Sequence, residues 1–146
     1  MRLFSFKTGR VVILTSGRFA GKKAIVTKVH DDGNKKHRFP HLLVAGIARN
    51  PKDIKRRINK KKFIKKTGVK AFLKHVNQNH VMPTRFVVND FDFKDLKEDN
   101  IKTAEARATA RKEIRKRFTE TYRNLPSTKT NDKAHNVRYF FNRLRF

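Results

Sequence analysis

The sequence contains no cysteine, and acidic residues are scarce in it. The missing thiols exclude a disulfide framework and every cysteine-based zinc site. Asp and Glu number 12 against 38 Lys and Arg, so the formal net charge of the 146 residues is +26. A small domain with this charge repels itself, and its natural counterpart is a polyanion. Composition therefore favours a nucleic-acid partner.

Long apolar runs are missing as well. No run approaches the roughly 20 residues that a membrane-spanning helix requires. The segment from Met1 to Lys7 is too short and too polar for a signal peptide. We therefore expect no membrane partner.

Motifs for catalysis and metal binding are also missing. No nucleophile motif occurs, and the pair Asp90 and Asp92 has no third ligand at a useful spacing. The six histidines show no metal-ligand spacing: His30, His37, His41, His75, His80 and His135. We therefore expect no enzyme activity, no metal, no cofactor and no small-molecule substrate.

Two β-rich runs, 11–14 and 24–29, flank a loop that contains Gly17 and Gly21. Glycine adopts positive φ without a steric clash, as a tight loop between strands requires. The loop carries basic side chains that can hold phosphates, with Phe19 among them as a stacking face. The alternative is an ordinary charged hairpin with Phe19 folded inward.

The following segments continue the sheet and add a basic excursion. The apolar run from His41 to Ile47 predicts a core strand. Residues 52–74 contain eleven Lys or Arg and one acid, yet apolar residues interrupt the charge. This mixture is unusual for a solvated tail, so we expect 52–68 to be an ordered phosphate-binding excursion. The chain then returns to the sheet at 69–76 and adds a last strand at 81–88.

The acids between Phe86 and Asn100 predict a boundary, which divides the chain into 1–90 and 91–146. The second part would hold an acidic linker, a basic helix at about 103–123 capped by Thr103, a linker at 127–133 and an aromatic, arginine-rich tail. We expect the tail aromatics to insert into a pocket of RNA or of a neighbouring protein. Removal of the residues after Val137 would then leave the first part folded. The alternative is that these rings fold back on the chain's own helix.

The glycine loop resembles a KOW motif, in Gly9, Val11, Ile13, Gly17, Gly21 and Val26, with Ala24 where a third glycine is common. The chain as a whole resembles the eukaryotic-type large-subunit ribosomal protein twenty-seven family. The specific blocks are 17–24, 43–47, 79–86 and 140–146.

The resemblance implies an α+β, mainly β fold: a KOW-type SH3-like barrel with a basic C-terminal helix and an extended tail. It implies a structural role on large-subunit rRNA in the cytosolic ribosome. Neighbouring ribosomal proteins would be partners, with nuclear and nucleolar transit during assembly. A KOW-type transcription-elongation or chromatin factor is the alternative.

Candidate RNA-binding residues are the basic side chains of the loops, the helix and the tail. They are Arg18, Lys22, Lys23, Lys35, Lys36, Arg38, Lys55, Arg56, Arg57, Lys60, Lys61, Lys62, Lys65, Lys66, Arg85, Arg107, Arg111, Arg115, Lys116, Arg138, Arg143 and Arg145. Candidate stacking anchors are Phe19, Tyr139, Phe140, Phe141 and Phe146.

Overall fold

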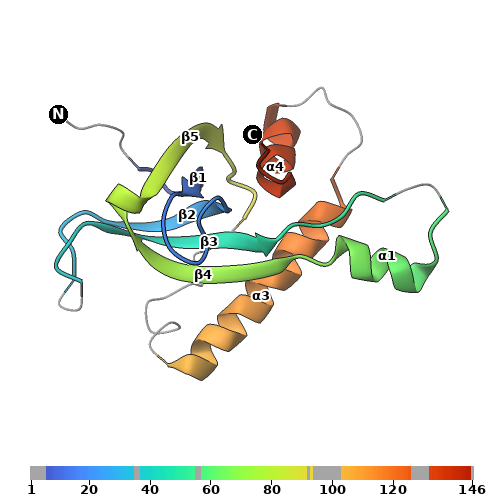
Figure 1. The fold of residues 1–146 in the computed structure, drawn as a ribbon, viewed down its shortest axis with the longest axis horizontal. Helices are drawn as coiled ribbons and strands as arrows, with labels where there is room; N and C mark the ends of the chain where they lie inside the picture. The colour runs from blue at the N-terminus through green and yellow to red at the C-terminus, as the bar shows by residue number, and fades with distance from the viewer. Residues whose placement is uncertain are drawn as a thin grey trace.

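The chain folds into one five-stranded antiparallel sheet with helices against it (Figure 1). The structure is a computed structural model that describes residues 6–34, 37–54, 57–91, 93, 103–125 and 132–145. The strands are β1 (Arg10–Leu14), β2 (Lys23–His30), β3 (His41–Arg49), β4 (Lys70–Asn77) and β5 (Val81–Val87), in the spatial order β4-β3-β2-β1-β5. The mixed, sheet-centred fold that the sequence predicts is confirmed.

The two edge strands of this sheet are consecutive in the chain. A single turn of 3-10 helix, η1 (Gln78–His80), joins β4 to β5. Three residues can connect opposite edges only if the sheet is strongly curled. The curl is held where the backbone N–H of Thr15 donates to the carbonyl of His80 at 3.1 Å. The sheet is nevertheless open, because no ladder pairs β4 with β5 among the described residues.

The turn between β1 and β2 has the glycine geometry that the sequence predicts. Gly17 and Gly21 both have positive φ, at 83° and 72°. The N–H of Gly21 donates to the carbonyl of Leu14 at 2.7 Å, which closes the loop. A side chain at either position would strain the backbone.

Apolar residues cover both faces of the sheet, which explains the nearly continuous apolar strands. Neighbouring residues alternate between two clusters because successive side chains point to opposite faces. Val11 belongs to the cluster under the helices, and Val12 belongs to the cluster inside the curl. Close approach inside the curl explains Gly46, since a Cβ there would overlap the ring of Phe72.

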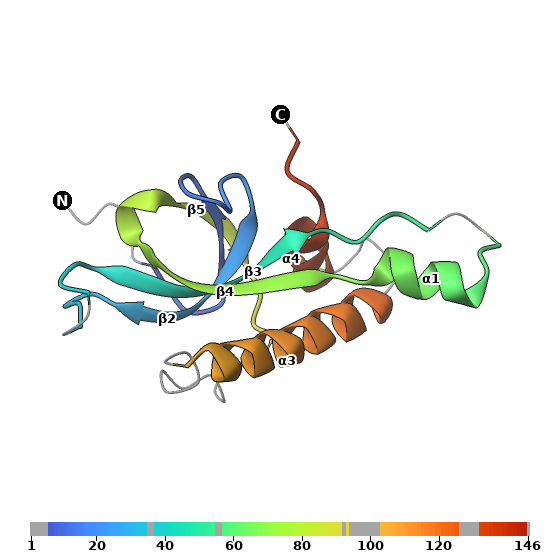
Figure 2. The ribbon, with the colours of Figure 1, turned by 60° about the horizontal axis from the view of Figure 1, so that its bottom comes forward.

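Three helices complete the fold: α1 (Lys60–Thr67), α3 (Ala104–Arg123) and α4 (Asp132–Phe141). The hydroxyl of Thr103 accepts from the N–H of Ala106 at 3.2 Å, so the predicted cap of α3 is confirmed. Figure 2 shows α3 running along β4 beneath the sheet. Helix α4 contacts β5. Both helices bury their apolar faces in the same cluster as the sheet.

The extended tail that the sequence predicts is wrong, because residues 132–141 form the helix α4. Its buried side chains are Ala134, Val137, Phe140 and Phe141. This spacing of three and four places the four on one helical face, and burial of that face stabilises the helix. Of the expected linker at 127–133, Asp132 and Lys133 already belong to α4. The rest of that linker lies outside the described residues, as do Asp92, Asp95, Glu98 and Asp99 of the acidic stretch.

The two parts that the sequence predicts, 1–90 and 91–146, share one buried cluster. Phe118 and Phe140, from the second part, share a cluster with Val11 and Ile25 of the first. Among the described residues, no helix is long and apolar enough to cross a membrane.

Candidate nucleic-acid interface

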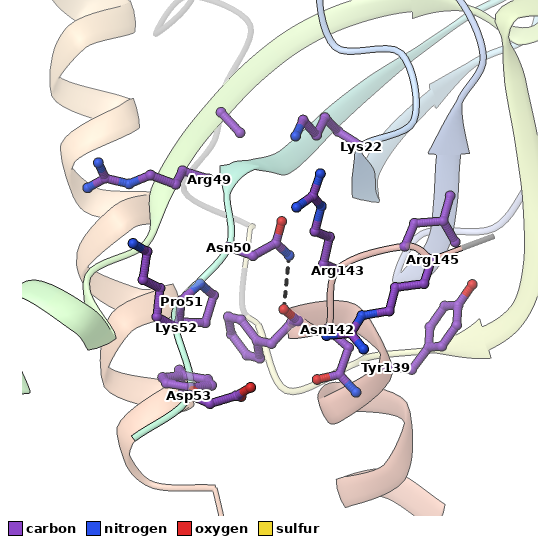
Figure 3. A pocket seen from close by; sticks show the side chains of 14 residues that line it. Lys22, Arg49, Asn50, Pro51, Lys52, Asp53, Tyr139, Asn142, Arg143 and Arg145 are labelled. Atoms are coloured by element: carbon purple, nitrogen blue, oxygen red, sulfur yellow. Dashed lines mark hydrogen bonds between the residues drawn. The ribbon is translucent and has the colours of Figure 1, made fainter. Parts of the chain in front are cut away.

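A basic groove of about 870 Å³ lies where the end of β3, the β1–β2 loop and the end of α4 meet (Figure 3). Five cationic side chains line it: Lys22, Arg49, Lys52, Arg143 and Arg145. Among the described residues that line it, Asp53 is the one acid. A concave surface with this excess of positive charge focuses an electrostatic field that attracts phosphate groups.

Side-chain contacts hold the end of α4 against the sheet and so shape the groove. The amide of Asn50 donates to the carbonyl of Phe141 at 2.9 Å (Figure 3). The chain leaves the helix directly after this contact, so Arg143 and Arg145 begin from a fixed point. In Figure 3 the side chain of Arg143 extends toward Asn50 and Lys22. A held backbone reduces the conformational entropy that is lost when these exposed side chains bind a phosphate.

The ring of Tyr139 borders the groove but has both faces occupied. One face stacks on Phe86 with the ring centroids 3.8 Å apart. The ammonium of Lys23 lies 3.7 Å from the ring centroid. Burial raises the pKa of the Tyr139 hydroxyl. Tyr139 is therefore a wall of the groove, and a base cannot stack on it without displacing one of these neighbours.

Tyr122 is the second ring of the groove, and it too is engaged by the protein. Its ring packs against that of Phe141 in an edge-type arrangement, with the centroids 5.4 Å apart. Burial, together with the nearby Asp53 carboxylate, raises the pKa of its hydroxyl. The groove thus presents cationic donors and few free ring faces, which suits the phosphate backbone of RNA better than its bases.

Lys23, a candidate RNA-binding residue, is a structural residue in this fold. Its side chain is only 5% exposed. The ammonium donates to the carbonyls of Tyr139 and Asn142, at 2.6 and 3.0 Å. The last carbonyls of a helix lack partners within the helix, and a cation there also interacts favourably with the helix dipole. The prediction for Lys23 is therefore corrected, because the ammonium faces α4 instead of solvent.

The aromatic anchors Phe19, Phe140 and Phe141 also contact the protein itself. Phe19 stacks on Phe72 with centroids 4.0 Å apart and planes 3° from parallel, which is the inward arrangement left open as the alternative. Phe140 and Phe141 are 0% and 2% exposed. The ring of Phe140 lies 5.2 Å from that of Phe118. The expectation that these two rings enter an RNA pocket is corrected, because they complete the core under the sheet.

A second basic surface lies on α1 and α3. The α1 candidates Lys60, Lys61, Lys62 and Lys65 are exposed, and Lys66 is half-buried. The α3 candidates Arg107, Arg111, Arg115 and Lys116 are exposed as well. A smaller groove of about 350 Å³ runs between the helices, and Lys112, Arg115, Lys116 and Arg123 line one side of it.

The remaining candidates are spread over the surface. Arg18, Arg38, Arg57 and Arg85 are exposed, and Arg138 is half-buried. The guanidinium of Arg18 lies 4.8 Å from the ring centroid of Phe19. Five candidates fall outside the described residues: Lys35, Lys36, Lys55, Arg56 and Phe146.

Two groove residues, Arg49 and Lys52, were missed by the sequence analysis. Arg49 is the last residue of β3, and Lys52 follows three residues later. Basic residues directly after a buried strand emerge at the edge of a sheet, where the chain returns to solvent. The position of the two residues directly after the strand could have marked them as exposed cations. It indicates a groove only when α4 is known to lie beside the end of β3.

Metal binding finds no support in the part of the chain that the structure describes. No group of three or more potential ligands among His, Asp and Glu is arranged there to hold an ion.

Comparison with known proteins finds relatives along nearly the whole chain. The model of the Ribosomal L27e protein family matches residues 11–146. The large ribosomal subunit protein eL27 of Tetrahymena thermophila is 49% identical over 143 residues, which cover 96% of this chain and 96% of that protein. The large ribosomal subunit protein eL27z of Arabidopsis thaliana is 39% identical, and eL27B of Saccharomyces cerevisiae is 37% identical, each over 141 residues and 96% of both chains.

Proposed function

The chain belongs to the ribosomal L27e protein family, and from this premise we propose that it binds large-subunit rRNA through the basic groove and the exposed faces of α1 and α3. It is a structural constituent of the large ribosomal subunit and not an enzyme. Its partners are the rRNA and neighbouring proteins of the same subunit. It works in the cytosolic ribosome, with nuclear and nucleolar transit during assembly.

The observation that carries the proposal is the convergence of five cations on one groove, against a single acid among its described lining residues. Two of them follow α4, two follow or end β3, and one lies in the β1–β2 loop. The fold gathers charges from three distant parts of the sequence onto one concave surface. Such a surface releases counterions from an RNA backbone when it binds. Because its contacts are to phosphates, it recognises RNA shape more than RNA sequence.

We also propose that the curled sheet is the KOW-type SH3-like barrel that the family resemblance implies. Two features support this assignment. The edge strands β4 and β5 are joined by three residues of η1, and an apolar cluster fills the inside of the curl.

The test is equilibrium binding of large-subunit rRNA fragments at KCl concentrations from about 50 to about 300 mM. Over this range the affinity of phosphate contacts depends strongly on salt. The wild-type affinity should fall steeply with salt. The double variant Arg143→Gln, Arg145→Gln should reduce the log–log salt slope by about 1.5, at roughly 0.7 to 0.9 per lost phosphate contact.

The matched control removes two charges outside the groove, in Lys7→Gln with Lys133→Gln, both exposed. It should change the slope less than the groove variant does. A wild-type affinity that is nearly independent of salt would contradict the proposed function. Equal effects of the two double variants would show that the groove is not the interface.

A further inference from the structure

One aromatic ring stands out at the tip of the hairpin formed by β2 and β3. Phe39 is 41% exposed, and every other phenylalanine or tyrosine among the described residues is half-buried or buried. The hairpin tip and α1 lie at opposite ends of the long axis in both views (Figures 1 and 2). The loop between β2 and β3, which contains Phe39, is therefore far from α1 and does not belong to the groove or to the helical surface described above.

The backbone beside Phe39 is tied to the fold by hydrogen bonds. The ring Nδ1 of His41 lies 3.0 Å from the carbonyl of Phe39, and since a carbonyl can only accept, the ring nitrogen donates. The N–H of Gln78 donates to the carbonyl of Pro40 at 3.3 Å. The side chain of Gln78 in turn donates to the carboxylate of Asp31 at 2.9 Å. These contacts fix the chain on both sides of the hairpin.

Histidine rings support Phe39 on its protein side. The ring centroid of His37 lies 5.5 Å from that of Phe39, and the centroid of His41 lies 6.0 Å away. His41 is fully buried, and it stacks on His30 at 4.7 Å. His75 completes this group, 5.4 Å from His41. Phe39 is thus the exposed outer member of a packed cluster of rings.

We propose that Phe39 is a stacking platform for an unpaired base of RNA, with Arg38 beside it to contact the adjoining phosphate. The inference rests on the proposed function and specifies that this second site binds an unpaired base. A ring that is already held in place pays little ordering entropy on binding, and base–aromatic stacking tolerates any base. RNA offers such bases where strands are looped, bulged or splayed.

The charge around the ring selects RNA over an apolar protein surface as the occupant. Arg38 is exposed directly before Phe39. In the sequence, Lys35 and Lys36 lie between Asn34 and His37, whose backbones are paired in a tight turn. An exposed ring with an exposed arginine directly before it suits a base with its phosphate, because both the apolar face and the charge then find partners.

The experiment compares two probes of equal length, a single-stranded oligoadenylate and a fully paired RNA duplex. Phe39→Ala should weaken binding of the single strand by about 5- to 150-fold, the range that 1 to 3 kcal/mol of stacking implies. Binding of the duplex, whose bases are not accessible, should change less than about twofold on the same reasoning. The salt slope should stay constant because no phosphate contact is removed.

Two further variants distinguish stacking on a π face from the effect of apolar side-chain volume. Phe39→Trp keeps a π face and should retain the affinity for the single strand. Phe39→Leu keeps apolar volume without the π face and should lose most of it. Met82→Ala is the control for loss of an exposed apolar side chain, since Met82 is 57% exposed on β5. Thermal unfolding of each variant checks that the hairpin still folds.

The outcomes distinguish this inference from the proposed function. Wild-type protein that binds neither probe contradicts both. If both probes bind in a salt-dependent way and Phe39→Ala changes neither affinity, the stacking role of Phe39 is wrong while the proposed function stands. Phe39 would then be a contact for a neighbouring protein. Equal losses for the single strand and the duplex overturn it as well, because the effect would then not depend on accessible bases.

Discussion

The ammonium of Lys23 lies 2.6 Å from the backbone carbonyl oxygen of Tyr139. The two residues are 116 positions apart in the sequence, so this hydrogen bond ties the start of β2 to the end of α4. The same ammonium covers one face of the Tyr139 ring. The contact fixes the helix end from which the groove arginines emerge. Lys23 thus supports the basic groove without lining it.

Lys23→Ala should therefore reduce the free energy of unfolding. The carbonyls of Tyr139 and Asn142 lose their donor in this variant. A hydrogen bond that involves a charged group contributes about 1.5 to 3 kcal/mol to stability. We expect a net loss of about 1 to 3 kcal/mol, measured by urea unfolding. Lys22→Ala is the matched control, and it should stay within about 0.5 kcal/mol because the Lys22 side chain lines the groove, while the hydrogen bonds to α4 come from Lys23. Equal losses for the two neighbours would contradict the structural role of Lys23.

The same residue predicts a dependence of stability on pH. Burial lowers the pKa of Lys23 from its usual 10.5 to about 8. Between these values the unfolded chain binds more protons than the folded chain, so the free energy of unfolding rises with pH. Below pH 8 both states hold the proton, and the gain is absent.

This rise should be measured from pH 8 to about 10 by urea unfolding, where the shift of Lys23 acts. Above that window Tyr122 and Tyr139, whose pKa values are raised in the folded state, oppose it. Lys23→Met removes the titrating group and keeps a side chain of similar length. It should abolish the rise, and a rise that persists in this variant would assign the effect to another group.

Removal of a ring from the end of α4 should destabilise the whole fold. Phe140 is fully buried, with Phe118 and Phe91 around it. Phe140→Ala should lower the free energy of unfolding by about 3 to 5 kcal/mol, since it removes buried apolar surface and leaves a cavity. Leu144→Ala, at a half-buried position after the helix, should cost far less.

Truncation after Val137 should then destabilise the sheet, which reverses the expectation drawn from the sequence. If the truncated chain melts at the same temperature as the full chain, the burial of Phe140 and Phe141 does not stabilise the fold.

Local features of the sequence were sufficient to predict most of the sheet and α3. The positive φ of Gly17 and Gly21 follows from a tight loop between two strands, and the cap at Thr103 follows from side-chain chemistry. The end of the chain was different. A run of aromatics and arginines fits an extended plug and an amphipathic helix equally well, and only burial against Phe118 decides between them.

The site divides in the same way. Arg143 and Arg145 were predicted from their own segment, and they do line the groove. Lys23 looked equivalent to Lys22, because charge and loop position are the same for both. What separates them is the approach of Tyr139 and Asn142 from the other end of the chain. Arg49 could not be predicted as a groove residue for the same reason, because the groove forms only where the end of α4 lies beside the end of β3.

The lysines of α1 offer a test of the second basic surface. The triple variant Lys60→Gln, Lys61→Gln, Lys62→Gln removes three exposed charges. It should weaken the binding of rRNA fragments and lower the log–log salt slope by up to roughly 0.7 to 0.9 for each lysine that contacts a phosphate. The free energy of unfolding should change by less than about 0.5 kcal/mol, because none of the three lies in the contacts that hold α1.

Those contacts supply the matching control. The hydroxyl of Thr67 donates to the carbonyl of Phe63 at 2.9 Å and accepts from the guanidinium of Arg123 at 3.2 Å. Thr67 is fully buried, so Thr67→Ala should destabilise the attachment of α1 to α3 by about 1 to 2 kcal/mol without changing the net charge. The two variants should separate RNA affinity from stability. If the triple variant lost as much stability as Thr67→Ala, the lysine run would hold the fold together and the surface of α1 would not be a phosphate-binding site.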